Sequence, residues 1–266
     1  MPVDVPAPYE DEFGLGVPLT ISVPLVVRAP AKLTRSLRIT GVRADGYHLL
    51  DAELVTVDLA DELTIAEGEL LAVIDETGGL GLPVPADGTN LVRRALAAAG
   101  RSAEVVLRKR IPAGAGLGGG SADAAAVLRW AGVTDPATAA GLGSDVPFCV
   151  VGGRARVTGV GDVVKPLAFE ERTVTLLIPP FGCPTPAVYA RWDDLGGPTG
   201  AAANDLEPAA LAVEPRLVEW RDRLGDATGA TPVLAGSGAT WFVDGAFPDI
   251  AGATVVQTVA AGWGTA

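Results

Sequence analysis

The sequence is poor in the residues that build disulfide frameworks and metal centres. Its 266 residues include two cysteines, Cys149 and Cys183, and a single histidine, His48. Two isolated cysteines provide neither a disulfide framework nor the paired spacing of a zinc site, and one histidine excludes a histidine-rich metal centre. We therefore expect a reduced, cytoplasmic protein that holds no metal ion by its own side chains.

Basic residues and long apolar runs are also scarce. Lysine and arginine number 20 against 32 acidic residues, which gives a net charge of −12. Nucleic acids and anionic membranes need a basic surface, so the composition argues against both as partners. No apolar run has the length of a membrane span, and the acidic, proline-rich start lacks the basic residues of a signal peptide. A small anionic substrate needs only a local positive site and remains compatible.

Aromatic residues make up only 5% of the chain, whereas hydrophobic residues reach 48%. The core must therefore consist mainly of small aliphatic side chains. Strand-like and helix-like segments mix along the chain, with the strands concentrated early, which predicts an α+β fold. We expect an N-terminal domain over residues 1–165, which includes an extra arm over residues 1–26, and a C-terminal domain over residues 166–266. Residues 1–19 of the arm are expected to be weakly ordered or to lie on the surface.

Local residue patterns predict the individual elements. Residues 89–100 are typical of a helix, with Thr89 or Asn90 as the N-cap. Pro30 is expected to end a strand that starts near residue 19, and Asp61 with its neighbour to divide residues 52–68 into two short strands. Residues 132–148 are expected to form a loop with at most one short helix. Further strands are expected at 33–42, 70–76, 103–111, 148–167, 173–179, 230–245 and 253–263, and further helices up to about residue 130, at 185–195 and at 207–225.

One glycine-rich stretch stands directly before an alanine-rich helix. The sequence IPAGAGLGGGSADAAAVL covers residues 111–128 and places five glycines in seven positions, namely Gly114, Gly116, Gly118, Gly119 and Gly120. Each glycine loses more conformational entropy on folding than any other residue, so five of them exceed what a tight turn requires.

Four interpretations of this stretch differ in the ligand that they imply. Residues 114–119 match the G-x-G-x-x-G pattern of dinucleotide-binding domains, but the acidic residue at the expected spacing, Asp135, stands in a turn-like segment. A Walker A loop fails because Gly120, not lysine, precedes Ser121. A tight turn without a ligand is the third interpretation. The fourth and favoured one is an anion cradle, in which free N–H groups at the start of the helix face a phosphate.

Further motifs accompany the glycine-rich stretch. APAKLTRSLRITGVRADGYHLL (29–50), GSDVPF (143–148), PTPAVY (184–189), NDLEP (204–208) and AGSGAT (235–240) occur in this order. With the glycine-rich stretch they resemble the GHMP kinase superfamily, and within it the family of 4-diphosphocytidyl-2-C-methyl-D-erythritol kinases. The resemblance extends from about Val27 to the C-terminal region. It implies a two-domain α+β fold, with an N-terminal domain like the second domain of a ribosomal protein, a ferredoxin-like C-terminal domain and the site between them.

The resemblance implies a catalytic pair and an ATP site. Lys32 of PAK and Asp145 of SDVPF match the catalytic residues of the family. A carboxylate can accept the proton that an attacking alcohol loses, and a nearby ammonium can keep that carboxylate ionised. The residues expected to hold ATP are Pro112, Gly114, Gly116, Leu117, Gly118, Gly119, Gly120, Ser121 and Asn90.

The resemblance also implies a cytidine site. Tyr47 of DGYH would stack on the pyrimidine, His48 would hydrogen-bond its edge, and Tyr189 of PTPAVY would complete a sandwich. Ser237 of AGSGAT belongs to a loop that closes over substrate phosphates. Thr34 occupies a further substrate-binding position.

Four departures make the sequence a divergent member. Thr34 stands where an asparagine is usual, and Ala235 stands where a serine is common. The segment between the alanine-rich helix and SDVPF is short, which implies a more open nucleotide side. The residues before Val27 are additional.

The implied activity is ATP-dependent phosphorylation of the 2-hydroxyl of 4-diphosphocytidyl-2-C-methyl-D-erythritol, a step of the non-mevalonate isoprenoid pathway. ATP and Mg²⁺ are the implied cofactors, and a monomer or homodimer is expected. One alternative is another GHMP kinase that acts on homoserine, mevalonate or a sugar; DGYH argues against it, because a cytidine platform would have no use there. A second alternative is a non-catalytic nucleotide-binding relative, and the presence of Lys32 and Asp145 argues against that.

Overall fold

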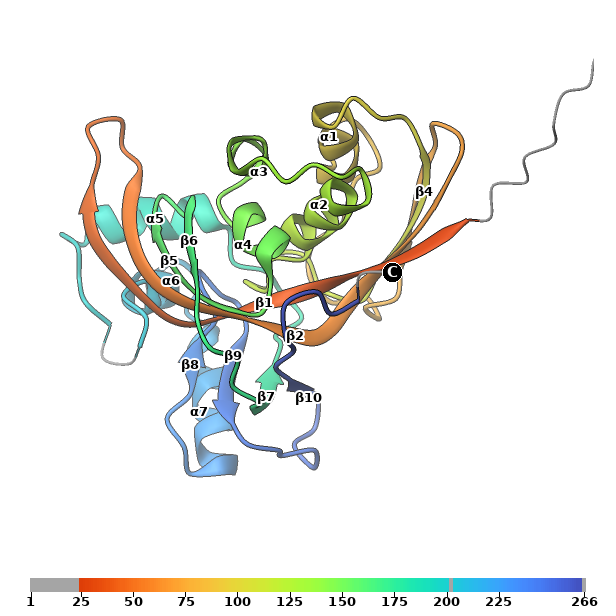
Figure 1. Ribbon diagram of the computed structural model, residues 1–266. Coiled ribbons are helices and arrows are strands. Elements are labelled where there is room, and N and C mark those ends of the chain that lie inside the picture. Colours follow the sequence, from red (N-terminus) through yellow and green to blue (C-terminus); the bar gives the residue numbers. More distant parts are fainter. Residues whose placement is uncertain (1–23, 201–202, 265–266) are drawn as a thin grey trace, which may run out of the picture.

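The computed structural model describes residues 24–200 and 203–264, and in this part of the chain two β-sheets pack with seven helices (Figure 1). The predicted arm therefore lies outside the described residues up to residue 23. Leu25 and Val26 belong to the first strand and pair with Ile65 and Thr64, within the segment that was expected to be a strand from near residue 19.

A long antiparallel hairpin forms the centre of the first sheet. Strand β2 pairs with β1 along one edge, while its other edge is shared by β5 and β4, and β3 lies parallel to β4 at the end of the sheet. The strands are β1 (Leu25–Val42), β2 (His48–Ala66), β3 (Leu71–Asp75), β4 (Glu104–Lys109), β5 (Arg154–Gly159) and β6 (Val163–Pro166). The predicted strands 70–76 and 103–111 are confirmed, and so is the hairpin predicted over 148–167, except that residues 148–151 are helical.

Two predicted interruptions of the hairpin were wrong. Pro30 does not end its strand, because a register shift between Pro30 and Lys32 accommodates it as a bulge. Asp61 does not divide β2, because its buried carboxylate is paired with Lys109. Both residues looked like strand breakers, but tertiary contacts satisfy each of them.

Four helices lie over one face of this sheet (Figure 1). They are α1 (Leu91–Ala98), α2 (Gly119–Trp130), α3 (Pro136–Leu142) and α4 (Val146–Val151). Asn90 is confirmed as the N-cap of α1, where its side chain accepts a hydrogen bond from the Val92 N–H. The prediction of at most one short helix over 132–148 was wrong, since Asp135 caps α3 and α4 follows soon after.

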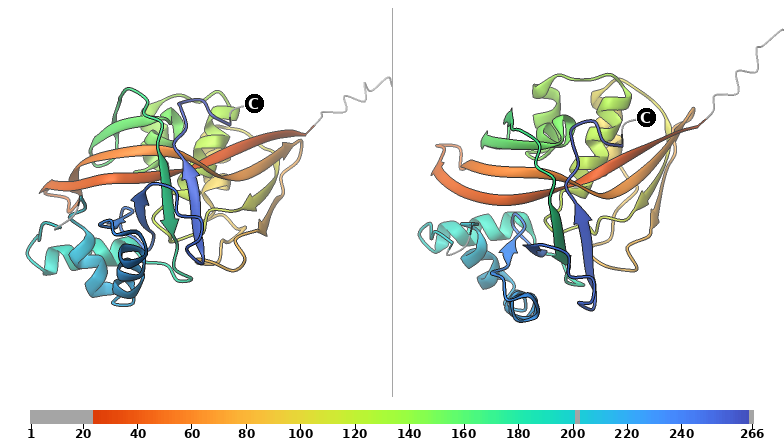
Figure 2. Two further views of the ribbon diagram at one scale, coloured as in Figure 1. Left: turned by 90° about the horizontal axis from the view of Figure 1, so that it is seen from below. Right: turned by 60° about the horizontal axis from the view of Figure 1, so that its bottom comes forward.

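The second sheet packs on the opposite side of the hairpin (Figures 1 and 2), in the strand order β10-β7-β9-β8. Its strands are β7 (Thr173–Leu177), β8 (Val233–Leu234), β9 (Trp241–Asp244) and β10 (Ala253–Gln257), and its helices are α5 (Thr185–Asp194), α6 (Glu207–Val213) and α7 (Leu217–Thr228). The strands predicted here are confirmed. The helical segment 207–225 is interrupted at Pro215, which cannot continue a helix.

The core is built from small aliphatic side chains, as the composition predicted. Alanines of α2 are almost fully buried against the first sheet, together with residues such as Leu63 and Leu107. The same hydrophobic cluster includes Leu177 and Trp241 of the second sheet. The two sheets therefore share one core, and the domain boundary at residue 165 stays a prediction.

Candidate active site

A cavity of about 320 Å³ lies where the glycine-rich stretch meets the hairpin. Residues far apart in the sequence line it, from β1, the glycine-rich stretch, the start of α4, α5 and the loop before β9. The predicted site residues among them are Lys32, Thr34, Pro112, Gly114, Gly116, Leu117, Gly118, Gly119, Gly120, Ser121, Asp145, Tyr189 and Ser237.

Lys32 and Asp145 meet at this cavity. The Lys32 Nζ lies 3.2 Å from Asp145 Oδ2 and donates a hydrogen bond of 3.2 Å to Thr34 Oγ1. The bulge after Pro30 precedes Lys32 directly, and bulges redirect side chains next to active sites. Asp145 stands at the N-cap of α4, yet its side chain makes no capping hydrogen bond, so its carboxylate remains available in the cleft.

The ammonium of Lys32 is nearly buried, with a side-chain exposure of 7%, whereas the Asp145 side chain keeps 36%. The geometry therefore holds one acid and one amine together, with the acid open to a ligand. This is the arrangement that proton transfer from a bound hydroxyl requires.

The glycine-rich stretch is wedged between Lys32 and the loop of residues 235–238. A Cβ on Gly116 would lie 2.2 Å from the Ala235 carbonyl oxygen, and a Cβ on Gly118 would lie 2.7 Å from the Lys32 Cγ. The Lys32 N–H also donates to the Leu117 carbonyl at 3.0 Å. Glycine is needed here because any side chain would collide with the backbone or with Lys32.

The start of α2 has the features of an anion site. Gly118 is its N-cap with a φ of 68°, a conformation that glycine adopts without strain, and no side chain caps the helix. The first N–H groups of a helix have no partner within it and carry its positive dipole end. Because Gly118, Gly119, Gly120 and Ser121 all line the cavity, these N–H groups are placed to face a phosphate.

A second lysine with two aspartates lies beneath the glycine-rich stretch, and the sequence analysis missed it. Lys109 Nζ pairs with Asp61 and, at 2.7 Å, with Asp123, and all three side chains are almost fully buried. Asp61 also accepts the N–H groups of Arg110 and Ile111 at 2.6 and 2.8 Å. The cluster therefore anchors the segment that enters the glycine-rich stretch. In the sequence, only the alternation of faces along β4 pointed to it, because it places Lys109 on the buried face with Val105 and Leu107.

A second recess, again of about 320 Å³, adjoins the cleft and shares Leu50, Ser144, Thr185 and Tyr189 with it. Tyr47 and His48 also line this recess. Tyr47 is 63% exposed, so its ring is open to a ligand. Burial, and then the nearby Asp145 carboxylate, raise the pKa of Tyr189, so its hydroxyl stays protonated. The structure thus brings together all three residues expected to surround a pyrimidine.

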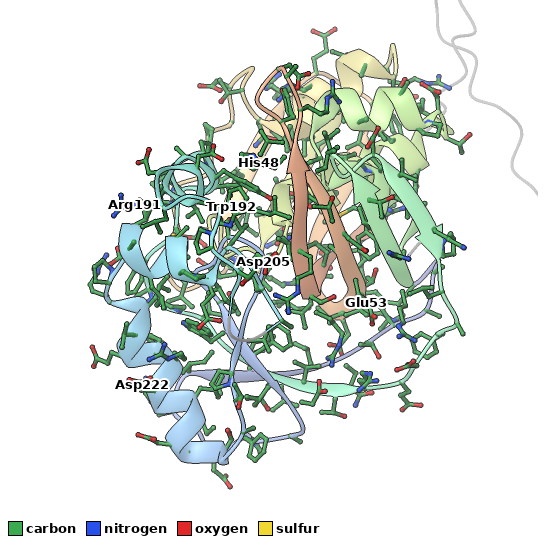
Figure 3. The ribbon with its side chains drawn as sticks, turned by 90° about the vertical axis from the view of Figure 1, so that its left-hand side faces the viewer. His48, Glu53, Arg191, Trp192, Asp205 and Asp222 are labelled. Carbon is green, nitrogen blue, oxygen red and sulfur yellow. The ribbon has the colours of Figure 1, made fainter. Side chains whose placement is uncertain are left out.

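Three side chains of helix α5 contact His48, whose position beside Trp192 is visible in Figure 3. The His48 ring centroid lies 4.8 Å from that of Tyr189 and 5.4 Å from that of Trp192, and its Nε2 lies 2.8 Å from Asp193 Oδ1. Residues 189, 192 and 193 share one face of a helix because of their spacing. Sequence reasoning missed Trp192 and Asp193, although this helical spacing after Tyr189 could have indicated them.

The remaining predicted residues have different surroundings. Ser237 is buried at the cleft and shares a 2.8 Å hydrogen bond with Thr185. Asn90 is not among the residues that line the cleft, and its side chain is bonded to the Val92 N–H and the Pro85 carbonyl. Its neighbour Leu91 does line the cleft. The nucleotide-binding role of Asn90 stays a prediction.

The two cysteines are not bonded to each other and both are buried. Burial raises the pKa of Cys149 to about 12 and that of Cys183 to about 11, so neither thiol is a ready nucleophile near neutral pH. Within residues 24–200 and 203–264, no three His, Cys, Asp or Glu side chains gather as metal ligands. No helix in this part of the chain is long and apolar enough to cross a membrane.

Comparisons with known proteins agree with this geometry. Residues 89–153 match the model of the GHMP kinases N terminal domain. A solved structure of a 4-(cytidine 5'-diphospho)-2C-methyl-D-erythritol kinase superposes with a TM-score of 0.70 at 31% identity, covering 88% of this chain and 99% of that one. A mevalonate kinase structure superposes with a TM-score of 0.55 at 12% identity, covering 89% and 99%, and shares the fold alone.

Curated relatives extend the similarity over most of the chain. The 4-diphosphocytidyl-2-C-methyl-D-erythritol kinase of Paracoccus denitrificans is 40% identical over 253 residues, covering 88% of this chain and 91% of that protein. That of Salinispora tropica is 37% identical, covering 88% and 85%. The predicted fold class and the predicted resemblance are thereby confirmed: the chain belongs to the 4-diphosphocytidyl-2-C-methyl-D-erythritol kinase family of GHMP kinases.

Proposed function

We propose that the protein transfers the γ-phosphate of ATP to the 2-hydroxyl of 4-diphosphocytidyl-2-C-methyl-D-erythritol. The observation that carries the proposal is the placement of Lys32 and Asp145, 3.2 Å apart, between the glycine-rich stretch and the recess of Tyr47 and His48. One end of this continuous cleft suits a triphosphate and the other suits a pyrimidine. An acid and an amine stand at the junction, where the phosphate acceptor would lie.

In this proposal Asp145 accepts the proton of the attacking hydroxyl as the phosphoryl group is transferred. Lys32 lies against this carboxylate and offsets negative charge on the transferring group. The bond between Lys32 and Thr34 orients the amine from its other side. Most of the rate enhancement of phosphoryl transfer comes from positioning and electrostatics, which the buried Lys32 supplies.

The ATP phosphates are assigned to the first turn of α2. The donors are backbone N–H groups, so the site offers hydrogen bonds and a helix dipole without a side chain that could obstruct the chain of phosphates. Mg²⁺ would be held mainly through the phosphates, as this ion prefers, and would neutralise part of their charge. That fits a cleft in which Asp145 and Ser121 are polar but no closed cage of ligands exists among the described residues.

The adenine is assigned to a neighbouring cavity of about 390 Å³, which shares Ala113 with the cleft. Aliphatic side chains line much of it, including Leu80, Leu82 and Val84. The Leu82 N–H donates to the Ala113 carbonyl at 2.9 Å, which ties this wall to the glycine-rich stretch. An aromatic base whose ribose and phosphates continue along residues 113–121 would fit this course.

The test is ATP consumption with the cytidine compound, with homoserine and with mevalonate, by the parent protein and by Asp145→Asn. We expect turnover with the cytidine compound alone, and a loss of about 10²–10⁴-fold in kcat in the variant, the range of general-base catalysis. Asp162→Asn is the matched control, since Asp162 lies outside the residues that line the cleft. Undiminished turnover by Asp145→Asn would discard the base, and activity with mevalonate but not the cytidine compound would discard the substrate.

A further inference from the structure

His48 is held in the recess by a set of contacts that the transfer reaction itself does not use. Its side chain is only 9% exposed, and its ring lies between Tyr189 and Trp192. The Trp192 Nε1 is bonded to the Pro198 carbonyl at 2.8 Å, so the indole has a fixed orientation of its own. Rotation of the imidazole is therefore restricted by rings on helix α5.

Asp193 decides the hydrogen-bonding character of this ring. Its Oδ1 lies 2.8 Å from His48 Nε2, and a carboxylate can only accept a hydrogen bond. Nε2 must therefore carry a proton. In the neutral ring the other nitrogen, Nδ1, is then an acceptor, because the hydrogen bond made by one ring nitrogen determines the state of the other. Nδ1 has no hydrogen-bond partner among the described residues.

The two common pyrimidines present opposite groups to such an acceptor. Cytosine carries an exocyclic amine, which donates, at the position where uracil carries a carbonyl oxygen, which accepts. An Nδ1 acceptor forms a hydrogen bond with the amine. Opposite the uracil carbonyl it forms none, because both atoms are acceptors and their lone pairs repel each other. A protein site that hydrogen-bonds a substrate group rejects an analogue that lacks it, because its own polar atom is left unpaired.

We propose that Asp193 is a positioning residue that makes the recess selective for cytosine over uracil, by holding His48 with its proton on Nε2 and its acceptor at Nδ1. This proposal rests on the proposed function, in which His48 contacts the edge of the pyrimidine. Asp193 is not among the residues that line the cleft or the recess, so it acts through His48. Its removal should therefore change base selection and leave the transfer step intact.

The first experiment compares cytidine and uridine forms of the diphosphate substrate. In Asp193→Asn the amide can either accept from or donate to Nε2, so both tautomers of His48 become populated. We expect the cytidine-to-uridine ratio of kcat/KM to fall about tenfold, the equivalent of one lost hydrogen bond, through KM rather than kcat. Asp193→Glu keeps an acceptor and should recover part of the ratio.

Asp194→Asn is the matched control. It changes the next residue of the same helix, whose side chain is 70% exposed and lies 3.8 Å from Arg191. It should leave the ratio within twofold of the parent value, and thermal unfolding of all variants checks that they are folded. A parent enzyme that uses both bases equally, or an Asp193→Asn variant with an unchanged ratio, would overturn the proposal.

The second experiment needs no turnover. His48 is the only histidine of the chain, so nitrogen NMR of histidine-labelled protein observes one imidazole without assignment. At pH 8 we expect an unprotonated Nδ1 whose resonance shifts on addition of CDP and not of UDP, and a loss of this tautomer in Asp193→Asn. A protonated Nδ1, or a bound CDP that leaves it unaffected, would overturn the proposal. An enzyme inactive on every substrate but showing the expected spectra would contradict the proposed function alone.

Discussion

Two lysines lie against the same glycine-rich stretch, and each is paired with aspartate, yet their surroundings differ. Lys32 lies beside Gly118 and faces the cleft with one carboxylate, Asp145, that remains 36% exposed. Lys109 lies beside Gly119 and is enclosed with two carboxylates, of which neither exceeds 3% exposure. The same residue types thus form an accessible pair on one side of the stretch and a buried cluster on the other.

The difference shows that the surroundings of a charged pair decide whether it can take part in chemistry or only stabilises the fold. Burial opposes the charge of Lys109, but Asp123 and Asp61 outweigh it and raise its pKa, so the amine is held as a permanent cation. Such a group is a poor candidate for chemistry but a strong anchor. The carboxylate of Asp145 keeps access to the cleft, as its proposed role as the base requires.

The largest effect should come from replacing each of the two lysines in turn. Lys109→Met leaves two buried carboxylates without their cation and should lower the free energy of unfolding by about 3–5 kcal/mol. Lys32→Met should change that free energy far less, because Asp145 can turn to solvent, while it removes most of the activity. Urea unfolding measures the stability of both variants, and ATP turnover measures their activity. Equal destabilisation by the two changes would contradict the distinction between a structural Lys109 and an accessible Lys32.

The next effect tests how tightly the glycine-rich stretch packs against the residues around it, which both lysines contact. Gly116→Ala places a Cβ 2.2 Å from the Ala235 carbonyl oxygen at a φ of +79°, and should destabilise by about 2–4 kcal/mol. Gly132→Ala is the matched control, since its φ of +74° is similar but its Cβ would meet no atom within 4 Å. Calorimetric melting should show a clearly larger drop for Gly116→Ala, and similar drops would mean that only the backbone angle matters.

The buried cluster should also make the stability of the protein depend on pH. Burial, only partly offset by Lys109, raises the pKa of Asp123 to about 8 from an ordinary value near 4. A raised pKa means that the folded state binds a proton that the unfolded state releases, so stability is present at low pH and falls as the pH rises toward 8.

Asp123→Asn should therefore flatten the decline in unfolding free energy between pH 5 and 8, by about 3–4 kcal/mol over that range. Its amide can also provide a donor at the position of Oδ1, which has no partner among the described residues. Asp226→Asn, at an exposed position, should leave the decline unchanged. A variant profile that matches the parent would show that Asp123 is already ionised throughout this range.

The smallest effect concerns the support of the open pair. Thr34→Val removes the hydroxyl that accepts from Lys32 Nζ, while Asp145 keeps its own contact with the amine. We expect kcat/KM to fall about fivefold, the equivalent of about 1 kcal/mol, which is the typical net contribution of one hydrogen bond. Thr40→Val, on the same strand but outside the cleft, should have no effect on kcat/KM. A hundredfold loss in Thr34→Val would give Thr34 a direct role in the chemistry.

Elements with local causes could be predicted from the sequence. The cap of α1 depends on Asn90 and its next neighbours, and the alternation of β4 depends on adjacent residues, so both appeared in the pattern. The interruptions predicted at Pro30 and Asp61 failed for the opposite reason. A bulge and a buried lysine from another strand satisfy these residues, and neither is visible in the local sequence.

The order of the motifs by itself determined the family and, through it, the residues to examine. Few kinds of chemistry are compatible with glycines, a lysine and an aspartate at those positions. The resemblance also implied that Lys32 and Asp145 form a pair, but only the tertiary structure decided how exposed each of them is. It alone paired Lys109 with Asp61 and Asp123, and it alone placed His48 against helix α5, which begins more than 130 residues later. Exposure and pairing depend on what packs around a charge, and packing is a property of the whole fold.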